Sequence, residues 1–159
     1  MTRLPQAAES SDAFSDSFAV NRSVIVAGNW KLNPPREEGW RLFQEVCAGV
    51  ARRGEIPSSL QVVIFPPLPY LGAWAAEWKP ENGAAIELGA QDVAQETWGA
   101  FTGQVGAPLL KEFGARYVLV GHSERRHLFG ESDVITGSKV SAAITAGLIP
   151  VLCVGETEP

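Results

Sequence analysis

The chain has 159 residues, with 13 Lys and Arg against 18 Asp and Glu, so its formal net charge is −5. This length suits one globular domain. The acidic balance, without a cluster of Lys and Arg, argues against nucleic acid or an anionic membrane surface as the main partner. The longest apolar runs are the length of a strand and fall well short of the roughly 20 residues that span a bilayer. We therefore expect a soluble protein whose main partner is neither nucleic acid nor a membrane.

The first residues differ in character from the rest. In residues 1–22, Ser and Asp interrupt every apolar run, so the segment does not form a signal peptide, and we predict a disordered N-terminal tail. Residues 23–159 are predicted to form the folded domain. Cys47 and Cys153 lie far apart in apolar contexts, which is typical of buried, reduced thiols. These features favour a cytoplasmic location.

Short runs rich in β-branched residues recur along the domain. We predict buried strands over residues 24–27, 62–65, 86–89, 117–120 and 149–154. The stretches between them are amphipathic or rich in small residues, which indicates helices. The pattern therefore predicts alternating strands and helices, as in a parallel sheet with right-handed crossovers.

Two of the predicted helices show clear boundaries. The first is expected to begin after Asn33 as N-cap, with the next proline in its first turn. It places an apolar stripe at spacings of three and four: Trp40, Phe43, Cys47 and Val50. The other helix is expected to begin near Asp133, to carry Val140 and Ile144 on its apolar side and to end at Gly147. Both stripes are predicted to pack on the sheet.

Two α/β architectures fit this pattern. The predicted strands start about 31 residues apart, and eight such units make about 250 residues, the usual size of a (β/α)8 barrel. Five strands alone would instead form an open, doubly wound sheet. The spacing by itself does not choose between them.

Polar residues follow two of the predicted strands. Asn29 and Lys31 come after the first strand, and His122, Ser123 and Glu124 come after the fourth. Side chains at these positions face the mouth of a barrel or the crevice of an open sheet. A lysine there suits an anion, and a histidine suits proton transfer or hydrogen bonding. A structural interpretation is also open, in which Asn29 forms a turn and Ser123 caps a helix.

Four motifs identify a family. AGNWKLN, GAFTG, VGHSERRHLFGESD and PVLCVGE occur at residues 27–33, 99–103, 120–133 and 150–156. Their order and approximate spacing resemble those of triosephosphate isomerase, and the resemblance extends from about residue 22 to residue 159. It implies a (β/α)8 TIM barrel, of which this chain supplies about the first five βα units.

The resemblance also implies an activity. Triosephosphate isomerases interconvert dihydroxyacetone phosphate and glyceraldehyde 3-phosphate in glycolysis and gluconeogenesis, without a metal or organic cofactor. Lys31 would hold the substrate and offset its phosphate, Asn29 would donate to a substrate oxygen, and His122 would polarise the carbonyl as a neutral imidazole, a role for which this family is itself the standard example. Ser123 would lie near the general base, and Glu124 near Lys31.

A long segment without helix or strand pattern covers residues 91–106. Loops of this length in compact domains usually bind something. A substrate lid and a mobile insertion are the alternatives to the role that the family gives this loop. In the family this loop enters the neighbouring subunit of a homodimer, with Thr102 near that subunit's active site. The chain has Gln104 where the family usually has a glutamate that pairs with an arginine, here Arg125, across the interface. We expect this contact to be weakened.

The chain ends at Pro159, just past the predicted fifth strand. The family's general base is a glutamate after the sixth strand, and its phosphate-binding loops follow the seventh and eighth. We therefore expect a fragment of the isomerase that is inactive by itself. The alternatives are a non-catalytic half-barrel that binds a phosphate ester or another protein, and a self-contained open-sheet binding module.

Overall fold

The computed structural model describes residues 23–54, 57–78 and 86–155. The predicted tail over residues 1–22 lies outside this part of the chain. Strands and helices alternate: β1 (Val24–Asn29), α1 (Arg36–Arg52), β2 (Leu60–Phe65), α2 (Leu68–Glu77), β3 (Ile86–Ala90), α3 (Ala107–Glu112), β4 (Tyr117–Val120), α4 (Ser123–Leu128), α5 (Asp133–Ala146) and β5 (Ile149–Leu152). The five predicted strands are confirmed. No helix in the described ranges is long and apolar enough to cross a membrane.

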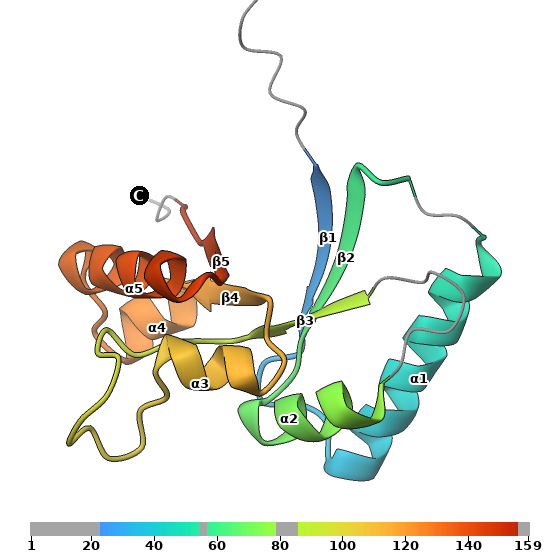
Figure 1. Ribbon diagram of the computed structural model, residues 1–159, viewed down its shortest axis with the longest axis horizontal. Coiled ribbons are helices and arrows are strands. Elements are labelled where there is room, and N and C mark those ends of the chain that lie inside the picture. The colour runs from blue at the N-terminus through green and yellow to red at the C-terminus, as the bar shows by residue number, and fades with distance from the viewer. Residues whose placement is uncertain (1–22, 55–56, 79–85, 156–159) are drawn as a thin grey trace, which may run out of the picture.

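The strand order distinguishes the two architectures. All five strands are parallel and lie in the order β1-β2-β3-β4-β5, so each strand pairs with the next one in the chain. A doubly wound sheet reverses its order part-way, and this sheet does not. The helices lie around the convex side of a curved sheet, whose concave side lies between β1 and β5 (Figure 1). This is the arrangement of a partial (β/α)8 barrel.

Alternate side chains of the strands enter two separate cores, because successive residues of a strand point to opposite faces. The larger core lies on the helix side and includes Ile64, Val118 and Val120. The smaller core lies on the concave side and consists of Val63, Phe65, Tyr117 and Leu119. Gly89 makes room for it, since a Cβ there would lie 2.3 Å from the Phe65 ring. Strands β2 and β4 are therefore packed on both faces, as in a barrel wall.

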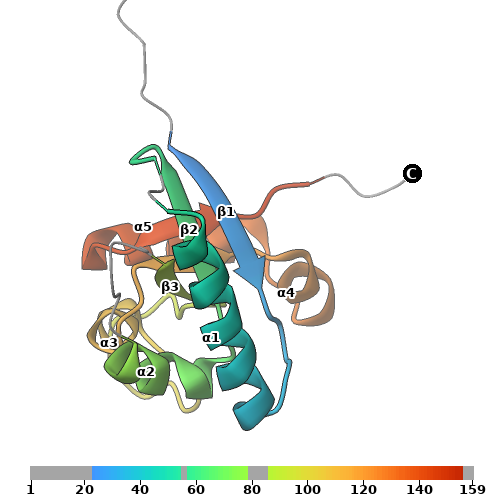
Figure 2. The same cartoon turned by 90° about the vertical axis from the view of Figure 1, so that its right-hand side faces the viewer.

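Helix α1 confirms the predicted stripe but not the predicted start. Phe43 is fully buried and Cys47 nearly so, in the larger core, with Trp40 and Val50 packed at its edge. Seen from the side of this helix, α1 lies in front of the sheet (Figure 2). The expectation that Asn33 caps it is wrong. The helix begins at Arg36 after two consecutive prolines, and a residue that precedes a proline is disfavoured in helical conformation.

Helix α5 begins and ends as predicted. The Ser132 hydroxyl accepts a hydrogen bond from the N–H of Ile135, 3.3 Å away, and Gly147 ends the helix with φ of 79°. The prediction that Ile144 lies on the packed side is wrong, because its side chain is 60% exposed. The helix instead buries a neighbouring stripe: Thr136, Lys139 and Ala143. A lysine thus takes a core position that the apolar pattern did not indicate.

The two cysteines differ in burial. Cys47 belongs to the larger core, and burial raises the pKa of its thiol to about 12. Cys153 is only partly buried, against the smaller core, and burial raises the pKa of its thiol as well. Both are free thiols. The prediction of burial is therefore confirmed for Cys47 and only partly for Cys153.

The predicted long loop joins β3 to α3 over residues 91–106. Its base is closed by a hydrogen bond from the N–H of Ala94 to the carbonyl of Val105, 2.9 Å long. Gly106 lets the two sides of the loop meet, since a Cβ there would lie 2.5 Å from the carbonyl oxygen of Thr97. Trp98 is 61% exposed in the projecting part. The loop is thus a closed projection that carries an exposed aromatic residue.

Candidate active site

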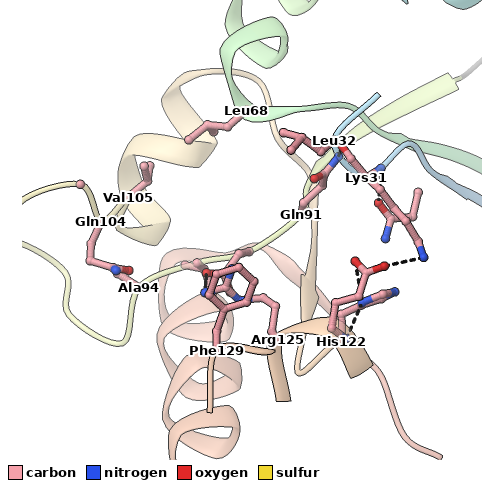
Figure 3. A pocket seen from close by; sticks show the side chains of 15 residues that line it. Lys31, Leu32, Leu68, Gln91, Ala94, Gln104, Val105, His122, Arg125 and Phe129 are labelled. Atoms are coloured by element: carbon pink, nitrogen blue, oxygen red, sulfur yellow. Dashed lines mark hydrogen bonds and ion pairs between the residues drawn. The ribbon is translucent and has the colours of Figure 1, made fainter. Parts of the chain in front are cut away.

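A depression lies at the carboxyl ends of the strands. Its lining comes from the ends of β1 to β4 and the segments that follow them, and the polar residues there include Asn29, Lys31, Gln91, His122, Glu124 and Arg125. Lys31 and His122 point toward one another on one side of it, and Gln104 lies on the other (Figure 3). Parallel strands bring their carboxyl ends to one edge, so residues 93 positions apart meet here.

Lys31 adopts an uncommon backbone conformation, with φ of 53°. For a residue with a Cβ this left-handed conformation is sparsely populated and costs roughly 1–3 kcal/mol. Hydrogen bonds hold it on both sides. The Lys31 N–H donates to Asn29 Oδ1 at 3.0 Å, and the Lys31 carbonyl accepts from Gln91 Nε2 at 2.9 Å. Asn29 and Gln91 therefore orient the lysine.

The Lys31 ammonium forms an ion pair with Glu124. Its Nζ lies 2.6 Å from Glu124 Oε1, and the two side chains are 52% and 44% exposed. The hydrogen bond from Lys31 holds the pKa of the Glu124 carboxyl below its ordinary value. Because both groups are exposed, an anion can reach the ammonium without displacing buried structure.

His122 is the N-cap of α4. Its Nδ1 accepts a hydrogen bond from the backbone N–H of Glu124 at 3.2 Å. A backbone N–H can only donate, so this contact favours a ring without a proton on Nδ1 and with the proton on Nε2. The alternative in which Ser123 caps the helix is wrong. His122 is the first residue outside the helix and its own side chain accepts from the first turn, so Nε2 is the ring nitrogen that remains as a donor.

The carboxylate of Glu124 lies between the two groups. Its Oε1 contacts Lys31 Nζ, and its Oε2 lies 3.5 Å from His122 Nδ1. The ammonium and the imidazole are therefore separated by the width of one carboxylate and lie at the same end of the sheet. A single small ligand can contact both.

The remaining predicted residues lie at different places. Ser123 is exposed in the first turn of α4, and Thr102 is exposed on the projecting loop outside the depression of its own chain. Gln104 lines the far side of the depression. Arg125 binds within its own chain, with Nη2 2.9 Å from Asp92 Oδ2 and Nε 2.6 Å from Glu131 Oε1.

Sequence reasoning missed Gln91 and Asp92 as parts of the site. The available signal was their position, because they follow β3 directly, as Asn29 ends β1 and His122 follows β4. The pattern alone does not indicate them, because Gln91 also begins the segment that has no helix or strand pattern. Within the described ranges, no three His, Cys, Asp or Glu side chains are grouped closely enough to hold a metal ion.

Comparison with known proteins identifies the family. A family model described as triosephosphate isomerase matches residues 24–159. The chain belongs to the triosephosphate isomerase family. It is 47% identical over 136 residues to the triosephosphate isomerase of Dechloromonas aromatica, and 51% identical over 136 residues to that of Stenotrophomonas maltophilia K279a. Each alignment covers 86% of this chain and 51% of the relative.

A solved structure agrees with this assignment. The crystal structure of triosephosphate isomerase from Bartonella henselae matches with a TM-score of 0.73 and 37% sequence identity, over 84% of this chain and 52% of that one. The five parallel strands are thus those of the triosephosphate isomerase barrel. The chain spans about half the length of the relatives it matches.

Proposed function

We propose that this chain belongs to an enzyme that interconverts dihydroxyacetone phosphate and glyceraldehyde 3-phosphate in the cytoplasm, in glycolysis and gluconeogenesis, without a metal or organic cofactor. The observation that carries the proposal is the meeting of Lys31 and His122 at one rim, on either side of the Glu124 carboxylate. A cation and a neutral donor at this separation suit a three-carbon phosphate. Family membership supports the same reaction.

The geometry supports a role for each residue. The Lys31 ammonium binds the substrate and offsets the phosphate, and the Asn29 amide donates to a substrate oxygen. The His122 Nε2–H donates to the carbonyl oxygen and stabilises the negative charge that develops there when the adjacent carbon loses its proton. Such a donor acts best when it is held in place beforehand, and the hydrogen bond from Glu124 N–H to Nδ1 holds this ring. Ser123 lies one residue further on, where we propose that it approaches the general base.

We propose that the 159-residue polypeptide by itself is inactive. Isomerisation needs a carboxylate that is free to take a proton from carbon. Two carboxylates line the depression in the described part of the chain, and both are bonded to cations: Glu124 to Lys31, and Asp92 to Lys139 and Arg125. In the family, the general base is instead a glutamate that follows the sixth strand.

We also propose a homodimer. The projecting loop is closed at its base and exposes Trp98 and Thr102, which suits insertion into a second copy. In such a dimer Thr102 approaches the partner's active-site rim. Gln104 faces the partner's arginine as an uncharged amide, which makes this contact weaker than an ion pair, although exposed ion pairs contribute only about 0–1 kcal/mol.

The function is tested in the full-length gene product with a coupled assay for glyceraldehyde 3-phosphate. We expect turnover, and a His122→Gln variant whose kcat falls by about 10² to 10³ while KM changes little. An unchanged kcat removes the role of His122. The 159-residue polypeptide, checked by intact mass, is expected to show no turnover, and an ordinary rate contradicts the proposed missing base.

A non-catalytic half-barrel is the second candidate, and the exposed sheet edges favour it. Val24 and Val26 of β1 are 59% and 55% exposed, and Leu152 of β5 is 48% exposed. Such edges suit pairing with another chain. Reading the gene beyond the codon for Pro159 separates the two candidates: an in-frame continuation with a sixth strand and a glutamate supports the enzyme, and a stop codon supports the binding protein.

A further inference from the structure

Four charged side chains form a closed ring beside the depression, which we call the buried ion-pair ring: Asp92, Arg125, Glu131 and Lys139. Asp92 Oδ1 lies 2.7 Å from Lys139 Nζ, and Asp92 Oδ2 lies 2.9 Å from Arg125 Nη2. Glu131 Oε1 contacts both cations in the same way. Each carboxylate thus pairs with both cations, and the ring has no net charge.

The ring is poorly explained as a source of stability. The side chains of Lys139 and Glu131 are only 5% and 6% exposed, and removing such charges from water costs several kcal/mol per ion. Glu131 Oε2 is also buried without a hydrogen-bond partner among the described residues. Apolar residues of similar volume would stabilise the fold as well or better. What the ring provides is a defined relative position of the segments that carry its members.

Two of those segments hold Lys31. Asp92 directly follows Gln91, whose Nε2 donates to the carbonyls of Lys31 and of Phe65, both at 2.9 Å. Arg125 directly follows Glu124, whose carboxylate binds Lys31 Nζ. Figure 3 shows Gln91 reaching toward Lys31, with Arg125 below it. The direct contact between Asp92 and Arg125 therefore joins the chain neighbour of Gln91, which holds the lysine backbone, to the chain neighbour of Glu124, which holds its ammonium.

We propose that Asp92, held by its two contacts in the buried ion-pair ring, is a positioning residue that acts on Lys31 through Gln91. Asp92 is the ring member attached to the end of β3, and its two oxygens hold α4 and α5 to that strand end. Loss of Asp92 frees the peptide that carries Gln91, and Lys31 then loses the contact to its carbonyl that supports its left-handed conformation. The inference rests on the proposed function, in which Lys31 binds the phosphate.

The test uses the full-length gene product and inorganic phosphate as the probe. Asp92→Leu removes both ring contacts, and we expect it to raise the dissociation constant for phosphate about tenfold. Asp92→Asn keeps an acceptor for Lys139 and is expected to stay within about threefold of the wild type. Glu131→Leu is the matched control, because it breaks the ring at a more buried carboxylate that does not adjoin a residue holding Lys31. It is expected to lower the melting temperature at least as much as Asp92→Leu, with phosphate affinity within about threefold.

A second variant keeps the test decisive if Asp92→Leu does not fold. Gln91→Met removes the link to Lys31 and leaves the ring intact, so we expect weaker phosphate binding at unchanged stability. Where Asp92→Leu does fold, it is combined with Gln91→Met in a double variant. The rise in the phosphate dissociation constant of this double variant is expected to be smaller than the product of the two single rises, since both substitutions act on one path.

The backbone resonances of Lys31 give a readout that does not depend on activity. In isotopically labelled protein, we expect the Cα shift of Lys31 to change in Asp92→Leu and in Gln91→Met, and to stay in place in Glu131→Leu. An unchanged Lys31 shift in both, or phosphate binding that falls in proportion to stability in all three, overturns the positioning role. If the wild type neither binds phosphate nor isomerises while the Lys31 shift responds as expected, the proposed function fails and the positioning role stands.

Discussion

Two lysine–glutamate ion pairs in this protein have direct contacts but opposite surroundings. Lys31 and Glu124 meet at the rim with side chains about half exposed, whereas Lys139 and Glu131 meet inside the ring with side chains that are almost fully buried. Water can replace either partner at the rim and cannot do so inside. The comparison teaches that the same pair of residue types leaves its charges open to solvent in one place and encloses them among packed segments in the other.

The largest expected effect comes from removing the exposed lysine. In the full-length gene product, Lys31→Ala is expected to lower kcat/KM by about 10³ or more under the proposed function, because Lys31 is the only lysine that lines the depression in the described part of the chain. The urea-unfolding midpoint should barely move. Steady-state kinetics and urea unfolding on the same preparation check this, and a variant that loses stability and activity together breaks the comparison.

Removing the buried lysine is expected to have the opposite profile. Lys139→Met leaves Asp92 and Glu131 with one cation, and breaking a buried pair in this way costs about 3–5 kcal/mol of unfolding free energy. The measurement is urea unfolding of the full-length gene product. Lys111→Met, at a lysine on α3 that donates to the Ala146 carbonyl in an exposed contact, is the matched control. A loss no greater than that of the control contradicts the assigned role of burial.

A titration compares the exposed pair in its two charge states. The hydrogen bond from Lys31 lowers the pKa of Glu124 from its ordinary value of 4.5. The contribution of this pair is therefore fully present above that value and is lost as the pH falls through the lowered pKa. Carbon-13 shifts of the carboxyl should give a midpoint below 4.5 that returns toward 4.5 in Lys31→Met. A wild-type midpoint at or above 4.5 contradicts the contact.

The smallest expected effect is that of salt. Raising the ionic strength from about 0.1 M to about 1 M shortens the Debye length from about 10 Å to about 3 Å. The midpoint of Glu124 should then move toward its ordinary value, because both partners face solvent. The destabilisation caused by Lys139→Met should not shrink, because its partners are screened little. If the Glu124 midpoint and the Lys139→Met destabilisation respond to salt to the same extent, the exposed and the buried ion pair do not differ in screening.

Much of the architecture was predictable from local pattern. The five strands follow from β-branched runs that are apolar on both faces, and the long loop follows from the absence of any pattern between Gln91 and Gly106. The family motifs also predict that Asn29, Lys31 and His122 share one site. These features are local because each depends on residues within one strand, one turn or one motif.

Other features were not predictable in this way. Helix α1 begins later than predicted because Asn33 and Pro34 each precede a proline, which disfavours helical conformation at both residues. Ile144 is exposed because α5 turns the face that carries Lys139 toward the core. A lysine is buried in a core only where carboxylates pair with it. One of those carboxylates, Asp92, lies 47 residues earlier in the chain, so no window along the sequence contains the reason.

The sequence by itself determined the alternation of strands and helices, the family, and the position of Asn29, Lys31 and His122 after their strands, since each of these follows from a short-range pattern. Only the tertiary structure decided the hydrogen bond from the Glu124 N–H to His122 Nδ1 and the ring that joins the segments of Gln91 and Glu124. The physical reason is that hydrogen bonds and buried charges are satisfied in space, by partners that the curvature of the sheet brings together.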